Sequence, residues 1–319
     1  MALRVAVIGV GHLGKHHARI LAALPGVELV AVVDTNRARA KEIAVAHGTQ
    51  PLFDARDLDG RVDAVTVAVP TAIHRDIARP FLDAGIAALV EKPLARSLAE
   101  ADDLIAAAQR SNTILAVGHT ERFNPAVAAA RRFLSDPRFI EVHRLGTFPE
   151  RSLDIDVVFD LMIHDLDVVL SLVSSEVAAV EAVGVPVLTN RVDIANARLR
   201  FANGCIANLT ASRISRDRVR KIRFFQPSAY VSIDYAAQKL EIYRLETGDG
   251  PAPAIQGGDV TVENDEPLRL ELADFADALV SRRPPRVTGE QGRRALAVAT
   301  EITDRIGTAT KARRHEDTL

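Results

Sequence analysis

Residues 4–14 read RVAVIGVGHLG, and residues 28–34 read ELVAVVD. The first stretch joins an apolar run to three closely spaced glycines, and residues 16–24 continue with apolar residues at helical spacing. The second stretch is another apolar run, and it ends in an acid, Asp34. A strand, a glycine turn, a helix and a second strand that ends in an acid predict a unit that binds a dinucleotide.

The three glycines have separate tasks in such a unit. Gly9 permits the tight turn, Gly11 lets the backbone approach a pyrophosphate, and Gly14 lets the helix pack close to the strand. His12 and Leu13 then lie at the helix N-terminus, where N–H groups and the helix dipole favour phosphate. The alternative is that these glycines serve only a tight turn.

The acid at the end of the second strand indicates which dinucleotide is bound. A carboxylate at Asp34 hydrogen-bonds a ribose 2′-hydroxyl and repels a 2′-phosphate, which favours NAD over NADP. Arg37 would offset part of that repulsion, and Thr35 belongs to the same cofactor-binding segment.

The first 120 residues alternate short apolar runs with helical patterns. The strand-like runs cover residues 4–8, 28–33, 64–69, 87–90 and 114–117. They are continuous rather than alternating, as in a parallel sheet covered on both faces. We therefore predict an α/β fold whose first domain, residues 1–122, is a doubly wound parallel sheet of the Rossmann type.

After residue 122 the pattern changes. Helical patterns at residues 125–134 and 157–173 are followed by short alternating runs through residue 243, typical of a mainly antiparallel sheet. Residues 248–258 indicate a mobile loop, residues 268–279 and 291–306 indicate helices, and residues 311–319 a charged tail. Residues 123–319 are thus predicted to form an α+β domain for substrate binding and oligomerisation.

Composition excludes several classes of protein. The 319 residues carry 40 Lys plus Arg against 42 Asp plus Glu, a net charge of -2, which argues against nucleic-acid or anionic-membrane binding. Cys205 is the only cysteine, which excludes an internal disulfide and a cysteine-cluster zinc site. The sequence has neither a signal-peptide pattern nor 18 consecutive apolar residues, so we expect a cytoplasmic protein.

Polar residues follow two further strands of the predicted parallel sheet. Pro70 and Thr71 follow the third strand, and Glu91 and Lys92 follow the fourth. Open α/β sheets bind ligands at this edge, where a lysine can hydrogen-bond a substrate hydroxyl. The alternative for Lys92 is a surface charge near the start of a helix.

Four polar residues are spaced to share one helical face in the second half. Asp156, Asp160, His164 and Asp167 follow one another at intervals of 4, 4 and 3. A carboxylate one turn before a histidine can orient the ring for general base catalysis. A solvated face or a helix-stabilising pair would give the same spacing. A metal site is not predicted, because no third ligand is implied.

Taken together, these motifs resemble the Gfo/Idh/MocA family of oxidoreductases over essentially the whole chain. The matching segments are Gly9–Gly14, Asp34, Pro70-Thr71 with His74, Glu91-Lys92-Pro93 and Asp160-x-x-x-His164. The resemblance implies an NAD(P)-dependent dehydrogenase that oxidises a sugar or cyclitol hydroxyl. It implies catalytic roles for Lys92, Asp160 and His164, with His164 as the acid/base. It also implies that Pro70, Thr71, His74, Glu91 and Lys92 contact the cofactor.

Residues 117–125 and 148–152 resemble, more narrowly, the UDP-N-acetylglucosamine 3-dehydrogenase branch. That branch supplies a 3-oxo sugar nucleotide to an aminotransferase on the way to diamino-sugar lipid A. The resemblance implies a set of substrate-binding residues, namely His119, Arg122, Asn124, Arg151, Asp156 and Arg213. The arginines would hold the diphosphate, because guanidinium groups bind oxyanions through two hydrogen bonds. Each arginine has a surface or salt-bridge role as its alternative.

One departure from the family pattern affects the pocket. Many relatives carry consecutive glycines where this chain has Asp154-Ile155-Asp156, so side chains replace bare backbone there. The two alternatives to the predicted function are a free-sugar or inositol dehydrogenase of the same family, and a regulatory protein that binds NAD without catalysis. The expected partners are a sugar nucleotide and further copies of the chain, in a dimer or tetramer, with no nucleic acid and no membrane.

Overall fold

The computed structural model describes residues 2–148, 155–246 and 254–316, which form two compact units. The first unit contains Met1–Thr120 and Glu266–Leu296, and the second contains Glu121–Asp265 and Ala297–Leu319. The sequence suggested one boundary, between residues 122 and 123. In the structure the chain instead returns to the first unit after residue 265 and then leaves it again.

The first unit is built on a six-stranded parallel sheet with the order β3-β2-β1-β4-β5-β6. Its strands are β1 (Leu3–Ile8), β2 (Val27–Val33), β3 (Gln50–Leu52), β4 (Ala64–Val67), β5 (Ala87–Glu91) and β6 (Leu115–Gly118). Every residue of β4 and β5 is buried, as the continuous apolar runs predicted. The strand order reverses between β1 and β4, where doubly wound sheets bind their ligands.

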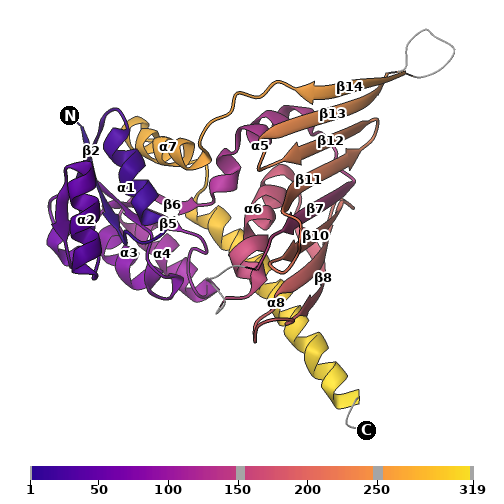
Figure 1. The fold of residues 1–319 in the computed structure, drawn as a ribbon, viewed down its shortest axis with the longest axis horizontal. Coiled ribbons are helices and arrows are strands. Elements are labelled where there is room, and N and C mark those ends of the chain that lie inside the picture. The colour runs from indigo at the N-terminus through magenta and orange to yellow at the C-terminus, as the bar shows by residue number, and fades with distance from the viewer. Residues whose placement is uncertain (1, 149–154, 247–253, 317–319) are drawn as a thin grey trace. The chain divides into compact units, whose positions relative to one another are not determined.

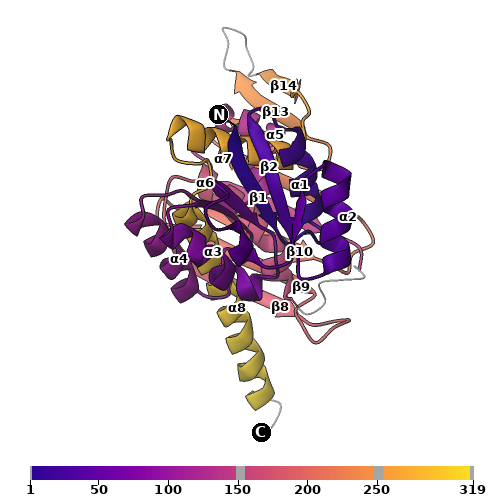
Figure 2. The same cartoon turned by 90° about the vertical axis from the view of Figure 1, so that its left-hand side faces the viewer.

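Helices cover both faces of this sheet. They are α1 (Gly14–Ala23), α2 (Arg37–His47), α3 (His74–Asp83), α4 (Leu98–Arg110) and α7 (Pro267–Ser281). Figure 2 shows α1 and α2 on one side of β1 and β2, and α3 and α4 on the other. The doubly wound fold predicted from the sequence is therefore confirmed.

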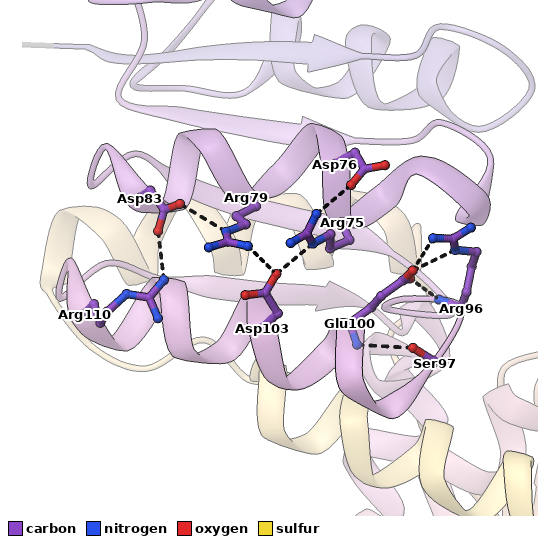
Figure 3. A network of polar contacts seen from close by, with 9 residues as sticks. All are labelled: Arg75, Asp76, Arg79, Asp83, Arg96, Ser97, Glu100, Asp103 and Arg110. Carbon is purple, nitrogen blue, oxygen red and sulfur yellow. Dashed lines mark hydrogen bonds and ion pairs between the residues drawn. The ribbon is translucent and has the colours of Figure 1, made fainter.

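A network of ion pairs joins α3 to α4 (Figure 3). The carboxylate of Asp103 on α4 accepts hydrogen bonds from Arg75 at 2.7 Å and from Arg79 at 2.9 Å. Arg110 completes the contact by donating to Asp83 at 3.0 Å. Because these side chains are partly exposed, each pair stabilises the contact only modestly.

Helix α7 explains why the chain returns to the first unit. Leu272 and Phe275 are fully buried in the same apolar cluster as Val5 and Leu21. The sequence shows that α7 has an apolar face, but such a face carries no information about which sheet it covers.

The second unit is built on an eight-stranded sheet with the order β14-β13-β12-β11-β7-β10-β9-β8. Its strands are β7 (Phe139–Leu145), β8 (Val177–Val185), β9 (Ile194–Phe201), β10 (Ile206–Ser212), β11 (Val219–Gln226), β12 (Ala229–Asp234), β13 (Lys239–Glu246) and β14 (Ala254–Val260). All neighbouring strands are antiparallel except β7 and β10. The mainly antiparallel sheet predicted from the sequence is confirmed.

The helices of this unit gather on one face of the sheet (Figure 1). They are α5 (Pro125–Ala130), α6 (Ile163–Leu172) and the second half of α8 (Gly289–Glu316). Side chains on this face, such as Ile140, Phe224 and Val231, are buried. The alternate residues of the same strands point to the opposite face.

That opposite face, which we call the open face, carries a row of four aromatic rings across β7, β11, β12 and β13. Phe139, Phe225, Tyr230 and Tyr243 lie in register, with successive ring centroids 5.6, 5.2 and 6.1 Å apart. Phe225 is 37% exposed and Tyr243 is 42% exposed. Large apolar rings in a continuous exposed row are characteristic of surfaces that bind a partner.

Two expectations for the later chain were wrong. The residues from Ala254 onward form β14 rather than a loop, and the helix α8 continues to Glu316 rather than ending in a tail at residue 311. The glycines of β14 suggested a turn, yet Gly257 is required for close approach. A Cβ atom at Gly257 would lie 1.9 Å from the carbonyl oxygen of Ile242 on β13.

We expect Phe275→Ala to unfold the first unit at lower urea concentration, although the residue lies far from β1 in sequence. Removing a buried ring costs about 3–5 kcal/mol. Val280→Ala is the matched control, because that side chain on the same helix is 72% exposed. Equal unfolding midpoints for the two variants would contradict the assignment of α7 to this core.

Candidate active site

The glycine turn after β1 has the geometry of a phosphate-binding turn. Gly9 has a φ of +85°, and a Cβ atom there would lie 2.7 Å from the carbonyl oxygen of Ala68. A Cβ atom at Gly14 would lie 1.7 Å from the carbonyl oxygen of Gly9, whereas one at Gly11 would meet nothing within 4 Å. The turn is therefore closed at its two ends and open in its middle, where backbone can approach a ligand.

The remaining residues of this turn are accessible. His12 and Leu13 are exposed beside Gly11, and α1 begins at Gly14. In the first turn of α1, His16 and His17 donate their N–H groups to the carbonyl oxygen of Leu13, and Lys15 donates to that of Gly11. The positive end of the helix dipole lies at this turn. This end of α1 can accept the phosphates of a dinucleotide.

Asp34 follows β2 and connects it to the glycine turn. Its Oδ2 accepts the N–H of Val10 at 3.0 Å, and its Oδ1 accepts the N–H of Asn36 at 2.8 Å. A carboxylate has about four lone-pair positions, so both oxygens can still accept a ribose hydroxyl.

Two arginines of α2 lie near this acid in sequence, and they behave differently. Arg37, predicted to face the cofactor, stacks its guanidinium 4.3 Å above the centre of the Phe53 ring. Thr35, two residues earlier in the same predicted segment, is exposed. Arg39 donates from Nε to the carbonyl oxygen of Val10 at 2.9 Å, which fixes the glycine turn. Sequence reasoning missed Arg39 because it belongs to no motif.

Residues after β4 and β5 lie at the same edge of the sheet as the glycine turn. Pro70 and Thr71 follow β4, and a short 3₁₀ helix begins at Thr71. Lys92 follows Glu91 at the end of β5 and is half-buried, and the Lys92–Pro93 peptide is cis.

Two buried histidines contact these loops. His17 on α1 lies 3.0 Å from a carboxylate oxygen of Glu91, and His74 at the start of α3 contacts the backbone on both loops. Burial lowers the pKa of His74, although the neighbouring carbonyls and the charge of Glu91 oppose that effect. His119, which follows β6, is buried in the same unit.

In the second unit, Asp160 and His164 lie on one continuous helical segment. The helix predicted over residues 157–173 is present, but Val158–Met162 is wound as a π-helix before α6 begins. Asp160 lies in the π-helical turn and His164 in the first turn of α6, and both are partly exposed among buried neighbours. Short π-helical turns are rare and concentrate at functional sites. Asp156 lies just before this segment and accepts the N–H of Val192 at 3.0 Å.

A buried charge cluster fixes α6 to the sheet. Arg144 on β7 donates two hydrogen bonds to Asp165, at 2.7 and 3.0 Å, and a third to Glu121 at 3.0 Å. Its guanidinium lies 5.2 Å from the centre of the Tyr235 ring. Burial raises the pKa of Asp165, the charge of Arg144 opposes the rise, and Glu121 adds to it. Asp165 directly follows His164, so this cluster positions the backbone that carries the predicted base.

Two residues predicted to bind substrate take part in contacts within the second unit. Arg122 is buried and donates to Asp167 at 3.2 Å. Asp167 is therefore buried against Arg122, whereas His164 is partly exposed. The spacing had suggested that both side chains lie on one polar face of the helix. Asn124 caps α5 by accepting the N–H of Ala126, and its amide donates to the carbonyl oxygen of Tyr235.

Arg213 is also buried, at the end of β10. It donates to Asp193 at 2.8 Å, to the carbonyl oxygen of Ile155 at 2.7 Å and to Thr189 at 3.0 Å. These contacts tie the chain next to Asp156 to the loop after β8. Arg151 lies outside the described residues.

The described residues contain no group of three His, Cys, Asp or Glu side chains that could hold a metal ion. Cys205 is buried, and burial raises the pKa of its thiol to about 11, which disfavours a nucleophilic role. Within the same part of the chain, no helix has the length and apolar character needed to cross a membrane.

Comparison with known families decides the class of enzyme. Residues 3–119 match the model of an oxidoreductase family with an NAD-binding Rossmann fold, and residues 130–231 match the GFO/IDH/MocA C-terminal domain. The chain belongs to the Gfo/Idh/MocA family of oxidoreductases. The resemblance inferred from the motifs is thereby confirmed.

Individual Gfo/Idh/MocA proteins agree over almost the entire chain. UDP-N-acetylglucosamine 3-dehydrogenase from Acidithiobacillus ferrooxidans is 40% identical over 302 residues, which cover 94% of this chain and 96% of that protein. Its crystal structure matches with a TM-score of 0.91 at 39% identity, over 96% of this chain and 98% of that one. Levoglucosan dehydrogenase in complex with NADH and levoglucosan shares the fold, with a TM-score of 0.87 at 20% identity over 97% and 98% of the two chains.

As a Gfo/Idh/MocA protein, the chain uses NAD, and the first unit fits that cofactor. The open backbone at Gly11 can approach a pyrophosphate, and Asp34 stands where an adenosine ribose is recognised.

We expect Asp34→Ala to weaken NAD binding by about 1–3 kcal/mol, because ribose hydroxyls and the Val10 N–H lose their acceptor. NADP should lose less affinity, since the repulsion of its 2′-phosphate disappears. Calorimetric titration with both cofactors measures this change in selectivity. Asp59→Ala, an exposed acid of the same unit, is the control. An unchanged ratio of NAD to NADP affinity in Asp34→Ala would contradict the role of Asp34.

Proposed function

We propose that this protein oxidises the 3-hydroxyl of UDP-N-acetylglucosamine to a ketone with NAD in the cytoplasm. The observation that carries the substrate is the 40% identity, across 94% of this chain and 96% of the relative, to UDP-N-acetylglucosamine 3-dehydrogenase from A. ferrooxidans. The product is a 3-oxo sugar nucleotide. We expect it to be consumed by an aminotransferase that leads toward diamino-sugar lipid A.

Three side chains perform the proton chemistry in this proposal. His164 takes the proton of the reacting hydroxyl, Lys92 stabilises the developing negative charge on its oxygen, and Asp160 orients the reacting groups. The substrate loses one proton and one hydride, so a secondary alcohol becomes a ketone. Bound NAD supplies the hydride acceptor.

The cofactor is held by the residues of the first unit. The backbone at Gly9, Gly11 and Gly14, with His12 and Leu13, surrounds the phosphates in this proposal. The adenosine ribose is held by Asp34, Thr35 and Arg37, and the remaining contacts come from Pro70, Thr71, His74, Glu91 and Lys92.

The substrate-binding residues are assigned to two tasks. Arg122 and Arg213 have buried carboxylate partners, so they support the site by holding chain segments in place. Arg151 is the first candidate for direct contact with the diphosphate. His119, Asn124 and Asp156 complete the proposed substrate set.

A panel of substrates tests the proposal. The purified protein and NAD are mixed with UDP-N-acetylglucosamine, UDP-glucose, free N-acetylglucosamine, glucose and myo-inositol, and NADH is followed by absorbance. We expect turnover with UDP-N-acetylglucosamine and a product two mass units lighter. Faster turnover of a free sugar or cyclitol would favour that substrate class instead. Tight NAD binding without turnover of any alcohol would favour a regulatory protein.

We expect Lys92→Met and His164→Asn each to lower kcat by about 10²–10⁴, the contribution of a positioned acid or base. NAD affinity should fall far less than kcat, because neither residue lies in the glycine turn and Lys92 supplies only one of the proposed cofactor contacts. The double variant should lose far less than the product of the two losses, since the groups act together.

Lys41→Met and His47→Asn are matched controls, because both residues lie on α2, outside the proposed catalytic set. Thermal melts establish that each variant is folded. A folded Lys92→Met or His164→Asn protein with near-normal kcat would remove that residue from the mechanism.

We also propose that the protein is a homodimer or homotetramer assembled through the open face of the eight-stranded sheet. The row of Phe139, Phe225, Tyr230 and Tyr243 supports this proposal, because association removes exposed aromatic surface from water.

We expect Phe225→Glu to reduce the mass measured by light scattering to that of a single chain at micromolar concentration. Val45→Glu is the control, since Val45 is 84% exposed on α2, a helix of the first unit. A wild-type protein that is monomeric across this concentration range would contradict the assembly.

A further inference from the structure

We propose that two buried histidines, His17 and His74, are positioning residues that hold the backbone on the two sides of Lys92. This inference rests on the proposed function, because it assumes that Lys92 acts in the chemical step. It adds His17 to the site, and it gives His74, proposed above as a cofactor contact, a further role that acts through Lys92.

His17 fixes the residue before Lys92. Its Nε2 atom lies 3.0 Å from Oε1 of Glu91, and both side chains are buried. The other carboxylate oxygen of Glu91 accepts the backbone N–H of Lys92 at 3.2 Å. Glu91 therefore connects the imidazole on α1 directly to the backbone of Lys92.

The carboxylate of Glu91 is held in its ionised form and in one place. Burial alone would raise its pKa, but the hydrogen bond from His17 and the charges of His17 and Lys92 outweigh burial and lower the pKa. On its remaining side, a Cβ atom at Gly118 would lie 3.0 Å from the carboxylate, so the carboxylate packs over the bare backbone of this glycine on β6.

His74 fixes the residue after Lys92. Its Nδ1 atom lies 3.0 Å from the carbonyl oxygen of Pro93, and its Nε2 atom lies 2.9 Å from the carbonyl oxygen of Val69. Burial lowers the pKa of His74 and favours the neutral ring, which carries one N–H group. The ring therefore donates to one of the two carbonyl oxygens and packs against the other, so it spans the loop that contains Lys92 and the loop after β4. A leucine side chain would leave the bonded carbonyl oxygen facing an apolar group.

Both histidines belong to helices with fixed positions. His17 lies within α1, whose first residue, Gly14, packs against Gly9 in the glycine turn. His74 begins α3, which the ion pairs of Asp103 join to α4 (Figure 3). On one side, the position of Lys92 is therefore fixed through Glu91 and His17 to α1, the helix proposed to receive the cofactor phosphates. A displacement of about 1 Å in such a group can lower the rate about 100-fold.

His17→Leu tests the first contact and His74→Leu tests the second, in the full-length protein with NAD and UDP-N-acetylglucosamine. We expect each to lower kcat by about 10- to 100-fold, with KM for the sugar nucleotide changed less than threefold. Hydrogen exchange at the Lys92 amide should be faster in His17→Leu, because Glu91 loses the donor that holds it.

Conservative variants distinguish positioning from mere stability. Glutamine places an amide N–H close to the position of a histidine Nε2 atom, whereas asparagine is too short. His17→Gln should therefore recover most of kcat, and His17→Asn should not, even if His17→Leu fails to fold. His47→Leu, on α2 with partial exposure, is the matched control and should keep the wild-type kcat.

The Lys92→Met background separates this inference from the proposed function. There, His17→Leu and His74→Leu should cause less than a twofold further loss of kcat, although their effects on the melting temperature persist. If Lys92→Met lowers kcat but folded His17→Leu and His74→Leu do not, the positioning roles are overturned and the proposed function stands. The positioning roles are also overturned if His17→Leu and His74→Leu lower kcat by the same factor in the Lys92→Met background as in the wild-type protein. A normal kcat in Lys92→Met itself overturns the proposed role of Lys92.

Discussion

The close approach of Gly14 to Gly9 is the contact on which the arrangement of the first unit depends. No side chain fits at Gly14, since its Cβ atom would lie 1.7 Å from the carbonyl oxygen of Gly9. That approach sets the start of α1 against the end of β1 and leaves the helix end accessible at Gly11. It also sets how far His17, one turn into the helix, reaches toward Glu91. The positions of the proposed phosphate site and of the Lys92 backbone therefore both depend on this one tight turn.

The second unit has a comparable constraint in the buried cluster around Arg144. The carboxylate of Asp165 is buried, that of Glu121 is partly buried, and both pair with the buried guanidinium of Arg144. Breaking such a buried pair leaves an uncompensated charge, which makes the arrangement costly to change. Because Asp165 adjoins His164, the cluster holds the start of α6 in place next to the π-helical turn that carries Asp160.

The sequence predicted the parts of this molecule that depend on local pattern. Continuous apolar runs predicted the buried strands β4 and β5, and the glycine spacing predicted the turn that ends at Gly14. The aspartate–histidine spacing placed Asp160 and His164 on one segment. It gave no sign of the π-helix, since no residue type marks that winding.

Contacts between distant residues were beyond sequence reasoning. The pair formed by His17 and Glu91 joins positions 74 residues apart, and His17 belongs to none of the motifs in the sequence. Arg122 and Arg213 were expected to face a ligand, yet their guanidinium groups contact buried carboxylates. A single sequence shows that an arginine is present but not which carboxylate its fold brings near.

In the proposed reaction, a hydride leaves C3 of a sugar nucleotide for NAD. This step is tested most directly with UDP-N-acetylglucosamine that carries deuterium at C3, in a single turnover followed by mass spectrometry of both products. We expect deuterium in the reduced cofactor and an unlabelled 3-oxo sugar nucleotide. Unlabelled NADH together with deuterium retained at C3 would contradict it.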